Sequence, residues 1–330
     1  MATPDEPVAH YFPLSSGQYV IKPGFYRLGH DFGNGAADRR LFQLDRQFAD
    51  YRRVKQQARC EDLDKYLCVT PEADTLAPLL NQFLIDRLCH EYPDRFQRVD
   101  TSKGQRLDCR LTGESLHFTH EGSYLDCHPA HQADTPAYRN GLDALALQIQ
   151  EDLALVDLRG GQDRLCAIHL CQPNHWDPRE KIGGDFAGIH QPVPDMARIN
   201  ARAAQLLQAC LQQGPFVRFA WGIATDERLN HHPEPAPGTD HQQWQGRAFD
   251  TARPAAWLRV ERQVLHGLPQ THAVLFTIRT YHIPLSDLSV AEQQLLYQAI
   301  AGMEESHRDY KGLADPTPLL DWLETLYTST

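Results

Sequence analysis

The stretch from residue 256 to 285 reads AWLRVERQVLHGLPQTHAVLFTIRTYHIPL, and it decides the fold class. Apolar and polar side chains alternate over 256–265 and again over 272–281, and HGLPQT joins the two runs. Period-two alternation on both sides of a short link that contains Gly and Pro predicts an antiparallel β-hairpin. We therefore expect the protein to contain an antiparallel sheet.

Helical and strand patterns are interleaved along the rest of the chain. Alternation predicts a second hairpin over 106–120, with Gly113 at its turn, and single strands over 164–173 and 215–224. Asp195 is expected to cap one of the helices. Apolar spacing predicts helices over residues 38–58, 71–90, 140–155, 195–212, 289–306 and 318–327. Hairpins interleaved with helices favour an α+β fold over alternating βαβ units.

The composition is that of a globular chain, with 330 residues of which 42% are hydrophobic and 23% charged. A formal net charge of -11 argues against nucleic acid or an anionic membrane surface as the main partner. No apolar run reaches the roughly 18 residues of a membrane span. The N-terminal sequence MATPDEPVAH lacks the basic start and apolar core of a signal peptide. We expect a cytoplasmic protein with a single domain, 1–330, because no linker interrupts the chain.

Cysteine and histidine patterns give no metal motif. The 8 cysteines are scattered without CxxC spacing, so we expect buried, reduced thiols and neither structural zinc nor an iron–sulfur cluster. His231 and His232 lie in a polar, proline-rich insert (226–250), and we interpret them as a solvated surface pair. His169, in the middle of a predicted strand, is expected to be a hydrogen-bonded core residue.

Four segments resemble the haem-dependent oxidative N-demethylase-like family. They are IQEDLALV (149–156), CQPNHWDPREKIGGDFAGIHQPVP (171–194), VRFAWGI (217–223) and, most specifically, the hairpin LRVERQVLHGLPQTHAVLFTIRTYHIPL (258–285). The resemblance extends over roughly residues 20 to 310. One position departs from the family pattern, because members often have Asn before the Trp of the third segment and this chain has Ala220.

The resemblance implies a PAS-like antiparallel sheet surrounded by helices, with a core at about 105–285 and helical N- and C-terminal additions. It also implies haem b as cofactor. The activity characteristic of the family is oxygen-dependent removal of a methyl group from a small secondary amine, which releases formaldehyde. Electrons would come from NADPH through separate flavin and iron–sulfur subunits, so this chain would be the haem-bearing alpha subunit.

Haem needs an axial donor, an apolar slot and cations for its propionates. His190 is our candidate for the axial ligand of the iron, because Pro192 and Pro194 stiffen the loop that carries it. The alternative is that His190 caps a neighbouring backbone group. Arg218 and Trp221, on the predicted strand 215–224, are expected to line the same cavity.

The hairpin carries a second set of candidates. Residues two apart in a strand point to one face, and on this basis each strand presents one polar line: Arg259, Glu261 and Gln263 on the first, and Thr277, Arg279 and Tyr281 on the second. Either this is a solvated polar face, or it is a buried charged network that lines a pocket. In the second case Arg259 or Arg279 would pair with propionates or with Glu261. Glu261 could also hold a protonated amine, and Tyr281 could donate a hydrogen bond to bound oxygen.

Two other functions remain open from the sequence. One is a PAS-type haem sensor or haem-binding protein without turnover, since fold does not settle function. The other is a structural or interaction protein that has kept the fold and lost the cofactor.

Overall fold

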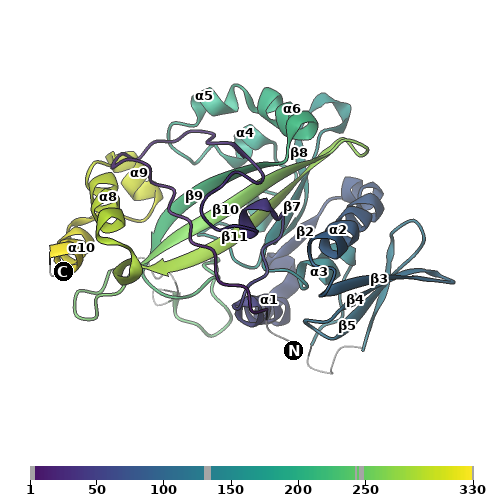
Figure 1. The fold of residues 1–330 in the computed structure, drawn as a ribbon. Coiled ribbons are helices and arrows are strands. Elements are labelled where there is room, and N and C mark those ends of the chain that lie inside the picture. The colour runs from purple at the N-terminus through teal and green to yellow at the C-terminus, as the bar shows by residue number, and fades with distance from the viewer. Residues whose placement is uncertain (1–3, 130–134, 242–243, 245–248, 329–330) are drawn as a thin grey trace.

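A seven-stranded antiparallel sheet forms the centre of the protein, in the order β1-β9-β10-β11-β7-β8-β2 (Figure 1). The computed structural model describes residues 4–129, 135–241, 244 and 249–328. The strands of this sheet are β1 (Tyr26–Arg27), β2 (Leu67–Val69), β7 (Asp152–Asp157), β8 (Arg164–His169), β9 (Phe216–Ala224), β10 (Trp257–Leu268) and β11 (Ala273–Pro284). A separate four-stranded meander comprises β3 (Phe96–Thr101), β4 (Gly104–Cys109), β5 (Glu114–Phe118) and β6 (Tyr124–His128). The expected α+β class with an antiparallel sheet is confirmed.

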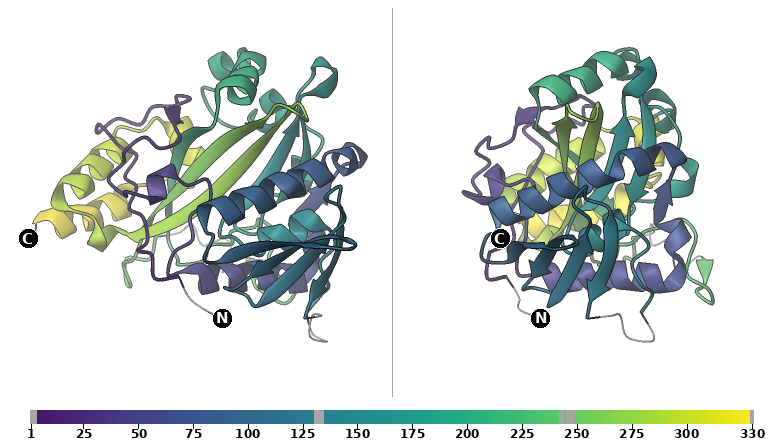
Figure 2. Two further views of the ribbon diagram at one scale, coloured as in Figure 1. Left: turned by 45° about the vertical axis from the view of Figure 1, so that its right-hand side comes forward. Right: turned by 90° about the vertical axis from the view of Figure 1, so that its right-hand side faces the viewer.

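Helices cover both faces and one end of the large sheet (Figures 1 and 2). The α-helices are α1 (Phe48–Asp62), α2 (Ala77–Glu91), α3 (Gly141–Ala146), α4 (Phe186–Ile189), α5 (Ala197–Asn200), α6 (Ala203–Gln213), α8 (Val290–Ala301), α9 (Glu305–Tyr310) and α10 (Thr317–Thr328). The segment α4–α6 lies over one face of the sheet. Helices α1–α3 and the small sheet lie on the other side, and α8–α10 gather at the end of the hairpin.

The β10–β11 hairpin is the longest pairing in the protein. Its register runs without interruption from Trp257 opposite Pro284 to Leu268 opposite Ala273. β9 pairs with the other edge of β10, and β7 with the other edge of β11. Most residues of both hairpin strands are buried, because these strands lie inside the sheet and are covered on both faces. The hairpin predicted from the sequence is confirmed; each strand begins one residue later and ends three residues later than predicted.

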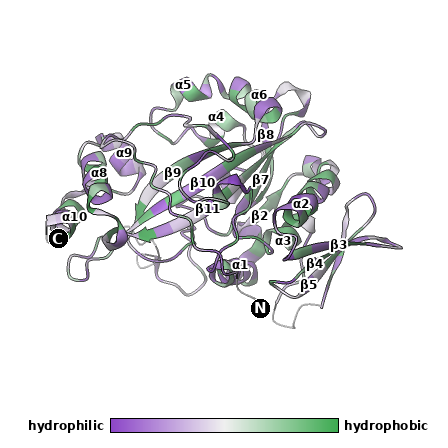
Figure 3. Cartoon of the chain, viewed as in Figure 1, coloured by the Kyte–Doolittle hydropathy of each residue, from purple (hydrophilic) through white to green (hydrophobic). Residues whose placement is uncertain are grey.

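The main apolar core lies between the large sheet, α2 and the small sheet. The side chains of Leu84 and Leu88 from α2 are buried there together with Val264 and Leu275 of the hairpin and Leu107 of β4. The hydropathy colouring shows the apolar side of α2 directed inward (Figure 3). This packing places the polar residues of β10 that face the other way against the α4–α6 segment.

The helix predicted over 140–155 is wrong in its second half, where α3 ends at Ala146 and β7 begins at Asp152. β7 lies between β11 and β8. A strand buried on both faces does not alternate, so its run of apolar residues was mistaken for the continuation of a helix.

Two other helix predictions need correction. Asp195 is no helix cap: its backbone φ is +59°, and α5 begins two residues later with Met196 at the N-cap. The helix predicted over 195–212 is interrupted between α5 and α6. The helix predicted over 38–58 begins only at Phe48.

The hairpin predicted over 106–120 is confirmed as β4 and β5, with Gly113 at φ +75° in its turn. These strands belong to the small sheet and not to the large one. The consecutive strands of the large sheet therefore begin at residue 152, and not at about residue 105, where the core was expected to begin. Within the described ranges, no helix combines the length and the apolar character needed to cross a bilayer.

Candidate functional site

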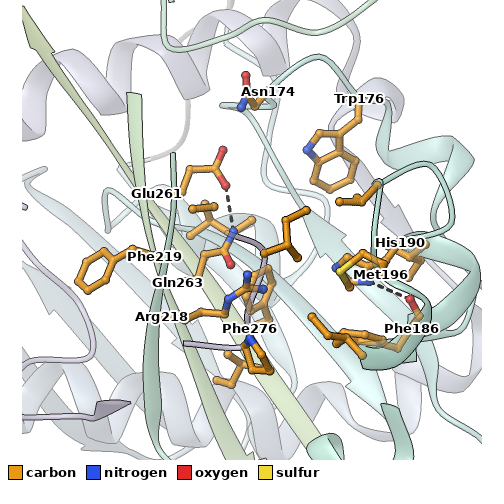
Figure 4. Close-up of a pocket in the computed structure, with 18 of the residues that line it drawn as sticks. Asn174, Trp176, Phe186, His190, Met196, Arg218, Phe219, Glu261, Gln263 and Phe276 are labelled. Carbon is orange, nitrogen blue, oxygen red and sulfur yellow. Dashed lines mark hydrogen bonds between the residues drawn. The ribbon is translucent and has the colours of Figure 1, made fainter. Parts of the chain in front are cut away.

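A cavity of about 610 Å³ lies between the large sheet and the α4–α6 segment (Figure 4). Strands β7 to β11, with Asp163 before β8, form one wall, and residues from Asn174 to Cys210 form the other. The rest of the lining comes from the N-terminal segment around Tyr19 and from Tyr310 and Lys311 after α9. Five of the seven residues proposed from the sequence line this cavity: His190, Arg218, Trp221, Arg259 and Glu261.

The polar wall follows from strand alternation. Arg259, Glu261 and Gln263 point to the same face of β10. In the register, Gln263 lies opposite Arg218 and Glu261 lies opposite Ala220. Directly opposed residues of antiparallel strands share a face. The side chains of Glu261 and Gln263 on β10 and of Arg218 on β9 therefore line the cavity together.

Arg279 and Tyr281 lie on the other face of the sheet, which corrects the expectation that they join Arg259 and Glu261 in one pocket. Arg279 is opposite Arg262, a neighbour of Glu261 that points away from the cavity. Arg279 binds the carboxylate of Asp45 at 2.7 Å, and the hydroxyl of Tyr281 donates to Gln43. Both side chains are buried in this second network, so we assign them a structural role.

The guanidinium of Arg259 is fixed beside the carboxylate of Glu261. Arg259 donates through Nη2 to the carbonyl of Gln172 at 2.7 Å and through Nη1 to the carbonyl of Leu229 at 3.0 Å. Its Nε lies 3.7 Å from Oε1 of Glu261. Gln263 donates through Nε2 to the other carboxylate oxygen at 3.0 Å. Glu261 is thus held from two sides, with its carboxyl group in the cavity.

Arg218 differs from Arg259 because its guanidinium has no hydrogen bond or ion pair among the described residues, and its Nε is fully buried. Burial lowers its pKa, and the charge of Glu261 opposes this shift. A half-buried cation without a partner is stabilised when an anion joins it. The position of Arg218 in the cavity wall therefore suits it to bind an anionic group.

His190 lies across the cavity from Glu261 and Gln263, directly after α4 (Figure 4). Its Nδ1 is 2.8 Å from the carbonyl oxygen of Phe186, so Nδ1 carries the hydrogen and donates. Burial lowers the pKa of His190, which favours the neutral imidazole. No described residue binds Nε2, so the lone pair of that nitrogen is available to a ligand.

The loop before His190 is fixed at several points. Asp185 caps α4 by accepting from the backbone N–H of Gly188 at 2.7 Å. Lys181 donates to the carbonyl of Ile189 at 3.2 Å, and Asp177 accepts from the backbone N–H of Arg179 at 2.8 Å. These contacts hold the loop that leads to His190 in place.

Lys311 belongs to the site and was not expected from the sequence. Its Nζ donates to the backbone carbonyl of Trp221 and lies 5.1 Å from the Trp221 ring and 5.0 Å from the Tyr19 ring. Burial lowers the pKa of Lys311 to about 8, and Glu261 opposes this shift. No local pattern marks the lysine, because it reaches the cavity only through the packing of the C-terminal helices.

The pair His231–His232 is buried, with 2% and 1% of the two residues exposed, so the expectation of a solvated surface pair is wrong. The backbone N–H of His231 donates to Pro173, and the carbonyl of His231 accepts from His175, each at 3.0 Å. The ring of His231 stacks on that of His175 at 4.9 Å and lies 2.9 Å from Asp226. This pairing draws the beginning of the insert against the cavity wall; residues 242–243 and 245–248 of the insert lie outside the described ranges.

The thiols match the expectation in part, and the other histidine matches it. Cys109, Cys166, Cys171 and Cys210 are buried, Cys68, Cys89 and Cys127 are half-buried, and Cys60 is exposed. His169 is a buried strand residue whose Nε2 lies 3.2 Å from Asp143, as expected for a core histidine.

One cluster of possible metal ligands, Asp177, His232 and Glu234, also lies near the cavity. The guanidinium of Arg179 already binds both of its carboxylates. A cation of the protein therefore occupies the place that a metal ion would take.

The family model described as haem-dependent oxidative N-demethylase, alpha subunit-like, matches residues 34–318 of the 330. The match includes the wall strands β9–β11, His190 and Lys311, so it covers nearly all of the cavity described above. By this match, the chain belongs to the family of haem-dependent oxidative N-demethylases of the alpha-subunit-like type.

Proposed function

We propose that the cavity holds haem b, with Nε2 of His190 as the axial ligand of the iron, and that the chain is the haem-bearing subunit of an oxygen-dependent N-demethylase. The observation that carries the proposal is His190 itself. Its imidazole faces the cavity with Nδ1 fixed by a backbone carbonyl and Nε2 free. A ligating histidine commonly uses its second ring nitrogen in this way, since that hydrogen bond sets the tautomer and the ring angle.

The rest of the cavity suits the same cofactor. Its volume of about 610 Å³ lies within the usual range for cofactor sites. Apolar side chains would contact the porphyrin, among them Ile168, Ile189, Val193, Leu207, Phe276 and Ile278. The guanidinium of Arg218, which has no partner among the described residues, would take a propionate. The sequence has no CxxCH motif for covalent attachment, which supports haem b.

A PAS-like core is part of the same proposal. The consecutive strands β7 to β11 lie in the order β8-β7-β11-β10-β9. Numbered from one to five along the chain, this is the PAS order 2-1-5-4-3, with the helices α4–α6 between the second and third strands. On this basis we place the PAS-like core at 152–284.

Haem, when bound, supplies the reductive activation of O2. Oxidation of the N-methyl carbon uses O2, two electrons and two protons, and gives one water and a carbinolamine. The carbinolamine then breaks its carbon–nitrogen bond to give formaldehyde and the demethylated amine. Glu261 would bind the amine nitrogen and hold the methyl group toward the His190 side of the cavity, while Arg259 and Gln263 fix the carboxylate. Apolar side chains on the opposite wall would exclude water.

Electrons must reach the haem from outside, because the chain has no sequence pattern of a flavin or iron–sulfur domain. The alpha-subunit-like family name supports partner subunits. We propose that these carry flavin and an iron–sulfur cluster and take electrons from NADPH. A small secondary N-methyl amine in the cytoplasm remains our choice of substrate.

The test begins with an absorption spectrum of the protein expressed with 5-aminolevulinate, before and after dithionite. A Soret band that shifts on reduction is expected. The protein is then incubated with dimethylamine, oxygen, and ascorbate with a redox mediator, which supplies the two electrons that each turnover requires, and formaldehyde is measured. A band without amine-dependent formaldehyde would identify a haem sensor or carrier, and no band after reconstitution with haemin would exclude the cofactor.

A further inference from the structure

We propose that Asp195, Glu304 and His307 form a binding site for one divalent transition-metal ion, for which zinc is the best match. The site joins the loop before α5 to α9, and none of its three residues belongs to the lining of the cavity. It contains no cysteine, so it differs from the cysteine-based zinc motifs that the sequence lacks. The inference does not depend on the proposed function.

Within the described ranges, three clusters of His, Cys and acidic side chains bring their ligand atoms within 4.8 Å of one another. The clusters are Asp177 with His232 and Glu234, Asp152 with His169 and Cys171, and Asp195 with Glu304 and His307. Arg179 already binds both carboxylates of the first cluster. In the second, Asp152 accepts from two backbone N–H groups, and Nε2 of His169 lies 3.2 Å from Asp143. The third cluster differs from both because its histidine has no hydrogen bond to the ring nitrogen that faces the carboxylates.

His307 supplies the observation that points to a ligand. Only 6% of its side chain is exposed, and the ring of Tyr19 packs against it at 5.0 Å. Its Nε2 is fully buried and makes no hydrogen bond among the described residues. Oδ2 of Asp195 lies 3.3 Å from this nitrogen but is not aligned for a hydrogen bond. A buried ring nitrogen without a hydrogen bond is unfavourable, and a metal ion bound by both groups would satisfy it.

The distance between these two ligand atoms fits a tetrahedral zinc ion. Zinc binds histidine nitrogen and carboxylate oxygen at about 2.0–2.2 Å, so two ligands at the tetrahedral angle lie roughly 3.3–3.6 Å apart. The observed separation of Nε2 of His307 and Oδ2 of Asp195 is 3.3 Å. Glu304 is exposed, so rotation of its side chain can bring its carboxylate to the same separation. Solvent water would complete the coordination.

Charge and ligand type also favour such an ion. Two carboxylates and a neutral imidazole balance the charge of a divalent cation. Among the described residues, neither Asp195 nor Glu304 forms an ion pair with a lysine or an arginine, so no cation of the protein takes this place. Imidazole is a ligand that zinc and its neighbours in the transition series prefer, whereas magnesium and calcium prefer oxygen ligands alone.

A bound ion would fix two segments that carry part of the cavity lining. Val193 and Met196 lie on either side of Asp195 in the chain, and both line the cavity. Residues 310–311, which follow His307 directly after α9, line it as well. The ion would therefore hold the α4–α6 segment and the C-terminal helices together beside the cavity.

The experiment titrates Zn²⁺ into the full-length protein, which is first treated with EDTA and desalted, and follows the heat of binding. Saturable binding of one zinc ion per chain is expected, together with a higher temperature of unfolding. Asp195→Asn is the main variant, because the Asp195 side chain is 71% exposed and Asn readily adopts the φ of +59° found at this position. It should weaken zinc binding at least about tenfold, since the loss of a ligand costs more than the loss of a hydrogen-bond partner of a ligand. Glu304→Gln is expected to act in the same direction.

Glu305→Gln is the matched control, because Glu305 is exposed on α9 next to Glu304 and should bind zinc as the unmodified protein does. The lack of a saturable site in the unmodified protein would overturn the inference. A site that keeps its affinity in both ligand variants would also overturn it, because the zinc would then lie elsewhere. So would an equal loss in Glu305→Gln, which would show only a general effect of negative charge. None of these outcomes involves haem or amine, so they leave the proposed function to its own test.

Discussion

The guanidinium of Arg259 lies beside the carboxylate of Glu261 in the cavity wall and fixes its position. Its Nε lies 3.7 Å from Oε1 of Glu261, while its terminal nitrogens donate to the carbonyls of Gln172 and Leu229 at 2.7 and 3.0 Å. The two carbonyls belong to the segments before and after β9. Arg259 therefore joins three parts of the chain and fixes the one acid of the amine site, although it need not touch the amine.

Replacing Arg259 with Met should lower the free energy of unfolding by about 3 kcal/mol, because two buried carbonyls and Glu261 lose their partner. Urea unfolding of the apoprotein measures this change. Arg253→Met is the matched control, since the Arg253 side chain is 90% exposed and is expected to change stability by less than about 0.5 kcal/mol. Equal stabilities of the two variants would show that Arg259 does not join these segments.

Glu151 predicts a pH dependence of stability. Its side chain is buried, one oxygen accepts from the backbone N–H of Gln43 at 2.7 Å, and the other has no partner among the described residues. Burial raises its pKa to about 7 from 4.5. The folded state therefore holds the proton more tightly than the unfolded state, and the stability gained below about pH 4.5 is lost as pH rises to about 7.

Glu151→Gln should remove this dependence, because the amide cannot ionise. At pH 8 the variant is expected to be more stable than the unmodified protein by about 3 kcal/mol, and near pH 4.5 the two should be similar. Unfolding curves at several pH values measure the difference. Glu305→Gln serves as the control, since Glu305 is exposed on α9. A Glu151→Gln protein with the same pH profile as the unmodified one would contradict the prediction.

The sequence predicted the hairpin and the shared face of Arg259 and Glu261, because both depend only on the alternation within one strand. It could not tell which residues of β11 share that face. That depends on the register, and a shift of one residue turns every side chain of the strand to the other face. Glu261 lies opposite Thr280, so Thr280 shares its face of the sheet. Arg279 and Tyr281, on either side of Thr280, therefore point away from the cavity.

Other parts of the site could not be predicted from local sequence patterns, for a different reason. Lys311 and the N-terminal segment around Tyr19 reach the cavity from opposite ends of the chain, and His231 is buried by a pairing with residues 173–175. Such contacts are decided by tertiary packing. His190 was singled out by a resemblance and a stiff loop, and its free Nε2 could be recognised only in the folded protein.

His190→Ala is expected to abolish the Soret band of the purified protein, because it removes the proposed ligand nitrogen. Added imidazole should restore the band in part, since it can occupy the space that the side chain leaves. His120→Ala is the control, because His120 is exposed in the small sheet and should leave the spectrum unchanged. An unaltered Soret band in His190→Ala would remove His190 as the axial ligand.

Arg218, which is half-buried, and Arg279, which is fully buried, lie on opposite faces of the large sheet, so their replacement by Met should have different effects. Arg279→Met leaves the buried carboxylate of Asp45 unpaired and should lower the free energy of unfolding by about 3–5 kcal/mol. Arg218→Met removes a half-buried cation that has no partner among the described residues, so the apoprotein should be unchanged or slightly more stable.

Haem affinity should show the reverse order. Titration with haemin is expected to give at least a tenfold weaker dissociation constant for Arg218→Met, a loss of about 1.4 kcal/mol or more, because a propionate loses its partner. The folded fraction of Arg279→Met should bind haemin as the unmodified protein does, since Arg279 binds Asp45 on the face away from the cavity. If Arg279→Met weakened haemin binding more than Arg218→Met did, the haem would have to contact the opposite face of the sheet, and the cavity beside His190 would not be its site.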